Sequence, residues 1–424
     1  MNELLLNLAA TRQAGRVRGI YSVCSAHPLV IEAAMRQAIA DESPLLVEAT
    51  SNQVDQFGGY TSMRPSDFRD FVFGIAQRVG FSEDKILLGG DHLGPNPWRD
   101  RPAQEAMQLA EELLATYAAA GFSKLHLDAS MACAGDPPQL DDALVAERAA
   151  RLCAAAEAAA PGGHLVYVIG TEVPVPGGAA EALANVEVTS PQGARRTLKV
   201  HQQAFAAVGL DSVWPRVIAL VVQPGVEFDH THVVDYAPAA AHALSGVLGG
   251  QSQFVFEAHS TDYQRPEALA QLVRDGYAIL KVGPGLTFAL REALYALSAI
   301  EAVLVPLEQR AHLPSVVERI MVEQPQQWQR YYHGGVDTQA QLRIFSYSDR
   351  MRYYWTHPAI QSAVDKLFRN LEKVEISENI LSQFMPEQYK AVRLKSLLPR
   401  PKELVMEHIQ CAIRPYVVAC QQHP

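Results

Sequence analysis

The chain of 424 residues is 48% hydrophobic and 19% charged, so it is long enough to bury a large core and too long for one minimal domain. Its net charge of −10 argues against a surface for nucleic acid or anionic membrane, because phosphate groups require clustered Lys and Arg. Five cysteines without close CxxC spacing favour free thiols over a disulfide framework or a zinc ribbon. The sequence shows neither a signal-peptide pattern nor an apolar run of membrane-spanning length, so we expect a soluble, cytoplasmic protein that recognises a small molecule or another protein.

Eight apolar runs of strand length recur along the chain, and stretches with helix signals separate them. The predicted strands cover residues 19–24, 44–49, 86–91, 124–128, 165–170, 217–222, 254–258 and 278–282. The predicted helices cover residues 28–40, 65–78, 103–120, 141–160, 198–208, 238–248, 266–275 and a stretch from 286 onward. Several of these helices begin with Pro or with an Asp or Ser cap, as helix starts commonly do.

This alternation predicts an α/β fold, a TIM (β/α)8 barrel over residues 1–304. A doubly wound open sheet is the alternative, but such sheets usually carry a Gly-rich phosphate turn after the first strand, and none follows Cys24. From about Val305 the alternation stops. We predict that residues 305–424 form a helical C-terminal extension packed on the barrel, with its Tyr and Trp clusters in packing contacts.

The most informative stretch is the third predicted strand, which runs from Ile86 through Gly90 and stops abruptly at Asp91-His92. A short apolar run of this kind suits a parallel sheet, where chemistry gathers at the carboxyl ends of the strands. Taken alone, Asp91 would more often cap the next helix and His92 would more often be a hydrogen-bonded core residue. Other strand ends carry similar residues, however, and a barrel brings all eight ends to one mouth.

Carboxylates and imidazoles at several neighbouring strand ends are costly to place unless something binds them. We therefore predict a divalent cation held by His92 and His259, with Glu172 and Gln223 as candidate oxygen ligands. Mixed nitrogen and oxygen ligands suit zinc with an open position for substrate. In this arrangement Asp91 and Glu172 are the candidate catalytic residues.

A second group of residues at the mouth suggests a phosphate or substrate site, because barrels commonly hold phosphate after strands seven and eight. The candidates are Ser51, Asn52, Asp128, Ser260, Lys281 and Gly283. His230 and His232 lie in a loop beyond a strand end, so a solvated or capping role is equally compatible with them. Arg350 and Arg352 would reach a second phosphate, although a charged helix face is the simpler interpretation.

Several long motifs resemble the GatZ/KbaZ family, and the resemblance covers nearly the whole chain. The motifs are SVCSAHP at 22–28, EATSNQVDQFGG at 48–59, GGDHLGPN at 89–96, HLDASM at 126–131, GTEVPVPGG at 170–178, VQPGVEFD at 222–229 and EAHSTDYQ at 257–264. The resemblance implies a subunit of D-tagatose-1,6-bisphosphate aldolase in galactitol or N-acetylgalactosamine catabolism, which supports the activity and stability of a GatY/KbaY partner. An oligomer is implied as well. Members are also labelled tagatose-6-phosphate kinases, but neither a P-loop nor a Gly-rich nucleotide loop occurs here.

The family is also similar to the class II zinc aldolases, whose catalytic Asp is directly followed by a His ligand. Asp91-His92 matches that pair, and His259 matches the late His at the end of strand seven. Ser51-Asn52 and Ser260 fall where those enzymes hold phosphate. The sequence departs from the aldolase pattern at strand six, where Gln223 replaces a His ligand and puts full aldolase activity in doubt.

Two functional hypotheses follow. In the first, which the resemblance favours, the barrel is an auxiliary aldolase subunit with a metal and sugar-phosphate site. In the second, the chain is a ketohexose-phosphate 4-epimerase that interconverts fructose and tagatose phosphates by cleaving and re-forming the C3–C4 bond.

Overall fold

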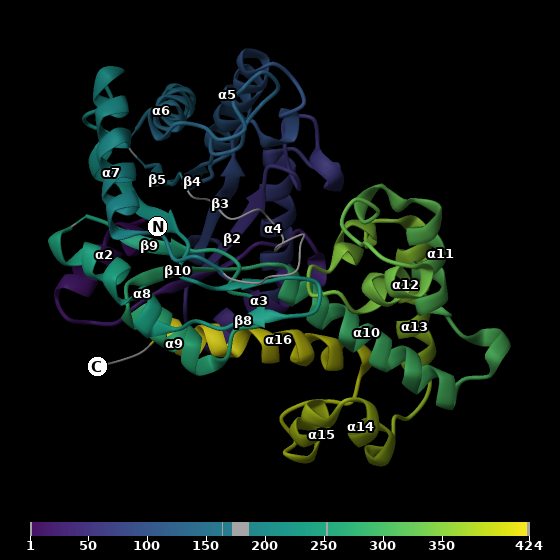
Figure 1. Ribbon diagram of the computed structural model, residues 1–424. Coiled ribbons are helices and arrows are strands. Elements are labelled where there is room, and N and C mark those ends of the chain that lie inside the picture. Colours follow the sequence, from purple (N-terminus) through teal and green to yellow (C-terminus); the bar gives the residue numbers. More distant parts are fainter. Residues whose placement is uncertain (1, 163, 172–185, 252, 422–424) are drawn as a thin grey trace.

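The computed structural model describes residues 2–162, 164–171, 186–251 and 253–421. Its centre is a closed barrel of eight parallel strands in the order β1-β10-β9-β6-β5-β4-β3-β2 (Figure 1). These strands are β1 (Ile20–Val23), β2 (Leu45–Thr50), β3 (Ile86–Leu93), β4 (Lys124–Leu127), β5 (Val166–Ile169), β6 (Val217–Val222), β9 (Val255–Ala258) and β10 (Tyr277–Val282). A short antiparallel pair, β7 (Glu227–Phe228) and β8 (Val233–Val234), follows β6. The predicted TIM barrel is confirmed, and its eight strands are the eight predicted ones.

Helices surround the barrel. Those that connect its strands are α3 (Pro28–Ala40), α4 (Pro65–Val79), α5 (Ala103–Ala119), α6 (Asp142–Ala159), α7 (Pro191–Ala207), α8 (Pro238–Ser245) and α9 (Pro266–Arg274). Helix α7 begins before the predicted residue 198, because Ser190 caps it by accepting a hydrogen bond from Gly193 N at 3.0 Å and Pro191 occupies its first position.

Two short helices close the amino-terminal end of the barrel. These are α1 (Glu3–Leu6) and α2 (Leu8–Gln13), and they bury Leu5, Leu8 and Ala9. These side chains belong to one apolar cluster with residues from the strands, among them Leu46 and Ile279. Because side chains alternate along a strand, the residues two positions further on, Glu48 and Lys281, face the interior closer to the carboxyl end. The barrel interior is therefore apolar at one end and polar at the other.

The chain leaves the barrel through α10 (Pro284–Leu304) and returns to it at its end. A group of helices lies beside the barrel (Figure 1), formed by α11 (Leu313–Glu323), α12 (Val336–Phe345), α13 (Pro358–Leu371), α14 (Glu378–Phe384) and α15 (Pro386–Arg393). The last helix, α16 (Pro401–Cys420), then packs against α3, α9, α10 and β1. Gly19 N donates to Cys420 O at 3.0 Å, and Tyr416 Oη donates to Thr261 O at 2.6 Å.

Helix α16 therefore occupies the place between the first and seventh barrel helices that the eighth helix fills in a TIM barrel. The division of the chain at residue 304 stays a prediction, because the apolar core runs without interruption from the barrel helices into the later ones. Within the described ranges, none of the helices is both long enough and apolar enough to cross a bilayer.

Candidate functional site

The polar end of the barrel holds a network of buried charges from five strands, β2, β3, β4, β9 and β10. Lys124 Nζ lies 2.7 Å from Glu48 Oε1 and 2.8 Å from Glu257 Oε2. Lys281 Nζ contacts Glu48 and lies 3.0 Å from Asp91 Oδ2. Burial lowers the pKa of the Lys281 ammonium to about 8. Three carboxylates face two lysines here, so the network retains negative charge that suits a further cation.

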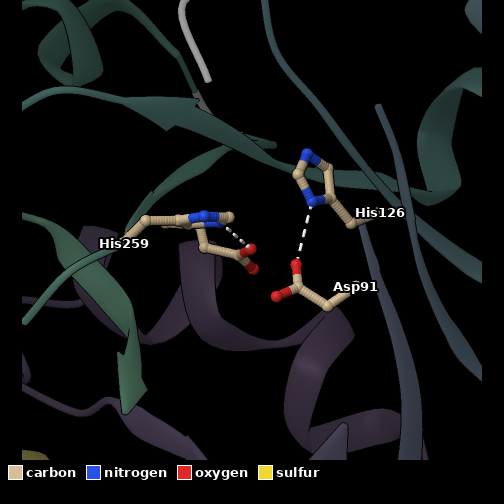
Figure 2. Close-up of side chains that lie close together, drawn as sticks. Asp91, His126 and His259 are labelled. Carbon is tan, nitrogen blue, oxygen red and sulfur yellow. Dashed lines mark hydrogen bonds and ion pairs between the residues drawn. The ribbon is translucent and has the colours of Figure 1, made fainter. Parts of the chain in front are cut away.

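Three histidines gather beside this network. The ring centroid of His92 lies 4.9 Å from that of His259 and 5.2 Å from that of His126, and the rings of His126 and His259 are 5.3 Å apart. His126 Nδ1 lies 3.0 Å from Asp91 Oδ1, and His259 Nε2 lies 2.9 Å from Glu257 Oε1. Figure 2 shows the hydrogen bond between the ring of His126 and the carboxylate of Asp91, with the ring of His259 to the left of them. The three imidazoles come from the ends of β3, β4 and β9 and converge on one place.

The backbone at His92 is strained in a way that directs its ring. His92 has φ 49°, a left-handed conformation that non-glycine residues seldom adopt. Its Nδ1 lies 2.8 Å from Asp128 Oδ2, and its carbonyl accepts a hydrogen bond from Ser51 Oγ at 2.7 Å. Nearby, a Cβ on Gly94 would lie 1.6 Å from Asp128 O, so only glycine fits this crossing. Asp128 and Ser51 thus fix the direction in which His92 Nε2 points.

Burial and neighbouring charges shift the pKa values of His92 and Asp91 in opposite directions. Burial lowers the pKa of His92, but the carboxylates of Asp91 and Asp128 outweigh it and raise that pKa to about 9. Burial raises the pKa of Asp91, but the charges of His92, His126 and His259 hold it well below its ordinary value. Asp91 is therefore ionised at neutral pH, and the cluster favours positive charge at its centre.

The donor set fits a divalent metal ion. One ligand atom from each of Asp91, His126, Glu257 and His259 lies within 4.8 Å of the others. The buried His126 Nε2 has no hydrogen-bond partner among the described residues. An unpaired buried nitrogen is costly, and a metal ion bound at Nε2 would satisfy it. The other ring nitrogen, Nδ1, accepts a hydrogen bond from His92 N at 3.2 Å. Imidazole nitrogens with carboxylate oxygens are ligands that zinc accepts.

A cavity at the mouth of the barrel brings several of the predicted residues together. Its lining includes Asn52, Asp91, His92, His259, Ser260, Lys281 and Gly283. Ser51 and Asp128 lie behind His92, as described above. Gln223 Oε1 accepts hydrogen bonds from Gly225 N and Val226 N, and among the described residues Gln223 is not part of the lining. Glu172, the other predicted oxygen ligand and catalytic candidate, lies outside the described residues.

The predicted phosphate position at Gly283 is occupied by an internal acceptor. Asp262 Oδ1 accepts hydrogen bonds from Gly283 N at 2.9 Å and from Gly285 N at 2.7 Å, at the start of α10. Burial raises the pKa of Asp262 to about 6. These amides stabilise the carboxylate as they would stabilise a phosphate oxygen, so they are not free in this structure.

Sequence reasoning from strand ends missed His126, the histidine with the unpaired nitrogen. A signal was present, because Lys124, His126 and Asp128 alternate with apolar residues along one strand. The structure places Lys124 and His126 inside the barrel, where both are fully buried. In contrast, His230 contacts segments that connect the C-terminal helices, with Nδ1 3.1 Å from Ser348 Oγ and Nε2 2.9 Å from Tyr331 O.

Three solved structures are similar to this chain to different degrees, and the first of them shares its architecture. A crystal structure described as a probable tagatose 6 phosphate kinase from Sinorhizobium meliloti 1021 is 52% identical with a TM-score of 0.89, covering 95% of this chain and all of that one. A fructuronate-tagaturonate epimerase from Cohnella laeviribosi is 12% identical, with a TM-score of 0.49 over 95% of this chain and 82% of that one. A fructose-bisphosphate aldolase from Campylobacter jejuni is also 12% identical, with a TM-score of 0.44 over 88% of this chain and 92% of that one.

The model of the family described as D-tagatose-1,6-bisphosphate aldolase subunit GatZ/KbaZ-like matches residues 5–421. This match covers nearly the whole sequence, including the barrel, the helices beside it and α16. The chain belongs to the GatZ/KbaZ-like family.

Proposed function

We propose that this chain is a subunit of a D-tagatose-1,6-bisphosphate aldolase, works with a GatY/KbaY-type partner in the cytoplasm, and retains a divalent metal and sugar-phosphate site of its own. The observation that carries the proposal is the convergence of His92, His126 and His259 on the ionised Asp91. Family membership supports the aldolase role. The kinase activity named for the Sinorhizobium meliloti relative is not part of the proposal.

His126 and His259 would hold the metal, for which zinc is the proposed ion, and Glu257 would complete or orient the set. His92 is outside that donor cluster and is proposed as a third nitrogen ligand because its ring lies 4.9 Å from that of His259. When bound, the ion polarises a substrate carbonyl and stabilises negative charge on its oxygen. Gln223 is not proposed as a ligand, because its side-chain oxygen already accepts two backbone hydrogen bonds. His126, from β4, takes its place in the ligand set.

Asp91 is the proposed acid/base residue, assisted by Glu172. The ionised Asp91 carboxylate accepts the proton of the C4 hydroxyl, the C3–C4 bond breaks, and its electron pair remains on the C3 fragment. Lys281 Nζ, 3.0 Å from Asp91 Oδ2, holds that carboxylate in place. Asn52, Ser260 and Lys281 line the cavity and are proposed to contact the sugar.

The same cluster supports a second function. If the two fragments stay in the cavity and rejoin on the opposite face of the C4 carbonyl, Asp91 returns its proton to the C4 oxygen and the sugar is epimerised at C4. The complete set of Asp91, the three histidines and Lys281 favours this 4-epimerase activity on fructose 6-phosphate and tagatose 6-phosphate.

One experiment tests the site and separates the two functions. The purified chain is assayed for zinc and for interconversion of fructose 6-phosphate and tagatose 6-phosphate, with and without a GatY/KbaY-type subunit. Turnover by the chain alone supports the epimerase, and activation of the partner supports the subunit role. His126→Ala should remove most of the zinc, whereas the control His230→Ala should keep it, since both ring nitrogens of His230 have protein partners. Equal metal loss in both variants would contradict the ligand assignment.

A further inference from the structure

Residues 346–349, a segment that follows α12, form specific hydrogen bonds with residues at the mouth of the barrel. Tyr347 N donates to His230 O at 3.0 Å, and Tyr263 Oη donates to Tyr347 O at 2.6 Å. Asp349 has φ 40° and accepts a hydrogen bond from Thr287 Oγ1 at 2.5 Å. These contacts come from three separate parts of the barrel, so they fix the position of the segment on it.

The segment continues into the short helix η8 (Arg350–Tyr354), which brings Arg352 and Tyr353 to the cavity. Arg352 lines this cavity together with Asp91, His92 and His259. It also lines an adjoining cavity of about 310 Å³, whose wall includes Trp355. Arg352 therefore stands where the two cavities meet, within reach of a ligand that contacts the histidine cluster.

The guanidinium of Arg352 is partly buried, and its recorded contacts are all to neutral groups. Nη1 donates to the carbonyls of Ser348 and Asp349, the latter at 3.1 Å, and Nη2 donates to Tyr353 Oη at 3.0 Å. Within the part of the chain that the structure describes, no carboxylate pairs with Arg352 within 4.0 Å. The nearby Asp349 carboxylate instead contacts Thr287 and lies 3.6 Å from Arg291. A cation withdrawn from water without a counter-ion is unfavourable, so an anion at this place would be stabilised.

The other cationic and amide groups at the mouth already have internal partners. Lys281 contacts Glu48 and Asp91, and the amides of Gly283 and Gly285 donate to Asp262. Of the Lys and Arg side chains among the described lining residues, Arg352 is the one without a carboxylate partner. An anionic substrate group would therefore find its strongest partner at Arg352 rather than at the start of α10.

We propose that Arg352, together with Tyr60 and Tyr353, binds the phosphate of the substrate while the sugar carbons extend toward Asp91 and the histidines. Tyr60 and Tyr353 both line the cavity, and their rings meet edge to face at 4.7 Å. A planar guanidinium with several donors suits a phosphate group. The identity of the sugar rests on the proposed function, but recognition of phosphate by Arg352 requires neither metal nor turnover.

Calorimetric titration with fructose 6-phosphate, fructose and inorganic phosphate tests this assignment. The variants are Arg352→Gln and the control Arg319→Gln, an exposed α11 arginine that pairs with Glu323 at 3.0 Å. Arg352→Gln should weaken binding of fructose 6-phosphate and inorganic phosphate by about 10- to 100-fold, because charge-assisted hydrogen bonds are lost. Fructose binding and zinc content should be unchanged, and Arg319→Gln should match the parent.

Three results would overturn the assignment. In the first, the parent protein binds no inorganic phosphate. In the second, the Arg352→Gln variant binds fructose 6-phosphate as tightly as the parent does. In the third, the substitution weakens the binding of fructose and of fructose 6-phosphate equally. A parent protein that binds phosphate but holds no zinc would contradict the proposed metal site and leave the assignment of Arg352 standing. The two proposals therefore fail in different ways.

Chemical modification of the parent protein tests the same assignment without relying on a variant that folds correctly. Phenylglyoxal modifies arginine side chains, and mass spectrometry of peptides reports the rate at each position. Inorganic phosphate should slow modification of Arg352 at least severalfold and leave that of Arg319 unchanged. Equal rates at Arg352 with and without phosphate would refute phosphate binding there.

Discussion

Asp91 lies between a histidine of the proposed metal site and a lysine of the buried charge network. His126 Nδ1 lies 3.0 Å from one of its carboxylate oxygens, and Lys281 Nζ lies 3.0 Å from the other. Neighbouring imidazoles keep its pKa low against the effect of burial. A carboxylate that is ionised and held in position from two sides has a free form that can accept a proton from a substrate hydroxyl, and its lowered pKa makes it a weaker base than an ordinary carboxylate. Its adjacent residue His92 has a different task because the strained backbone turns its ring toward Asp128.

The first prediction separates proton transfer from metal binding. Asp91→Asn keeps the shape of the side chain but cannot accept a substrate proton. If the chain is a 4-epimerase, interconversion of fructose and tagatose 6-phosphates should therefore fall by about 10² to 10⁴. Zinc content and binding of fructose 6-phosphate should remain, as measured by metal analysis and calorimetry. If Asp91→Asn lost all zinc, Asp91 would be a ligand and the division of roles with His92 would be wrong.

The second prediction concerns Asp262 and pH. Burial raises the folded-state pKa of Asp262 to about 6, above its unfolded value, so its contribution to stability is complete below about pH 4 and is lost as pH rises through 6. Asp262→Asn removes this titration. Relative to the variant, the parent should lose about 3 kcal/mol of unfolding free energy between pH 4 and pH 8, measured by urea denaturation across that range.

The control for Asp262 is Asp235, an exposed acid that pairs with Arg265 at 3.1 Å. Asp235→Asn should follow the pH dependence of the parent, since a surface ion pair contributes little. Parallel curves for the parent and for Asp262→Asn would show that Asp262 does not titrate in this range.

At the scale of elements, α16 is the feature that holds the molecule together. It buries an apolar face that includes Leu404, Val405, Met406, Ile409, Ile413, Tyr416 and Val417. It also donates the Tyr416 hydroxyl to Thr261 O, two residues beyond His259. The helix that closes the barrel wall therefore also supports the loop after β9, where the cavity begins.

The third prediction compares two positions on α16. Ile413 is fully buried, whereas Val418 is 66% exposed. Ile413→Ala should lower the free energy of unfolding by about 2–4 kcal/mol through lost burial and a cavity. Val418→Ala should change it by less than about 0.5 kcal/mol. Denaturant unfolding of both variants measures the difference, and equal costs would argue that α16 does not pack as described.

Local elements could be predicted from the sequence, but their distant partners could not. Helix α3 runs over the predicted residues 28–40, since Pro28 opens it and His27 accepts a hydrogen bond from Leu29 N. The pairing of α16 with α3 has no local signal, because it joins residues some 370 positions apart. The same limit applies to the site. Asp91, His92 and His259 stood out as strand ends, whereas Arg352 reaches the cavity only through the folding of a distant segment.

At the scale of the whole molecule, the family implies a second chain. The fourth prediction is that mixing with a GatY/KbaY-type subunit yields a complex that elutes as one species and raises the thermal stability of that subunit. A ligand that binds only the folded state stabilises it by about 2.7 kcal/mol at 100 times its dissociation constant. Size-exclusion chromatography and thermal unfolding at micromolar concentration measure both effects.

The Asp91→Asn variant serves as a control in the mixing experiment with the GatY/KbaY-type subunit. Asp91→Asn should support the partner as well as the parent does if the role of the chain is purely auxiliary. Separate elution with an unchanged unfolding temperature would favour the stand-alone epimerase instead.

The position of α16 also has a consequence for synthesis of the protein. Because Gly19 at the start of β1 bonds to Cys420, the first and last parts of the chain must meet before the barrel wall is complete. A nascent chain on the ribosome therefore lacks the helix that covers β1 between α3 and α9 until residues 401–420 emerge from the exit tunnel. Ribosome-bound chains stalled at residue 400 should be cleaved rapidly by added protease, whereas released chains should resist it. We therefore expect the faces of α3, α9 and α10 that α16 covers to stay exposed for longer than in a barrel whose eighth helix directly follows its eighth strand.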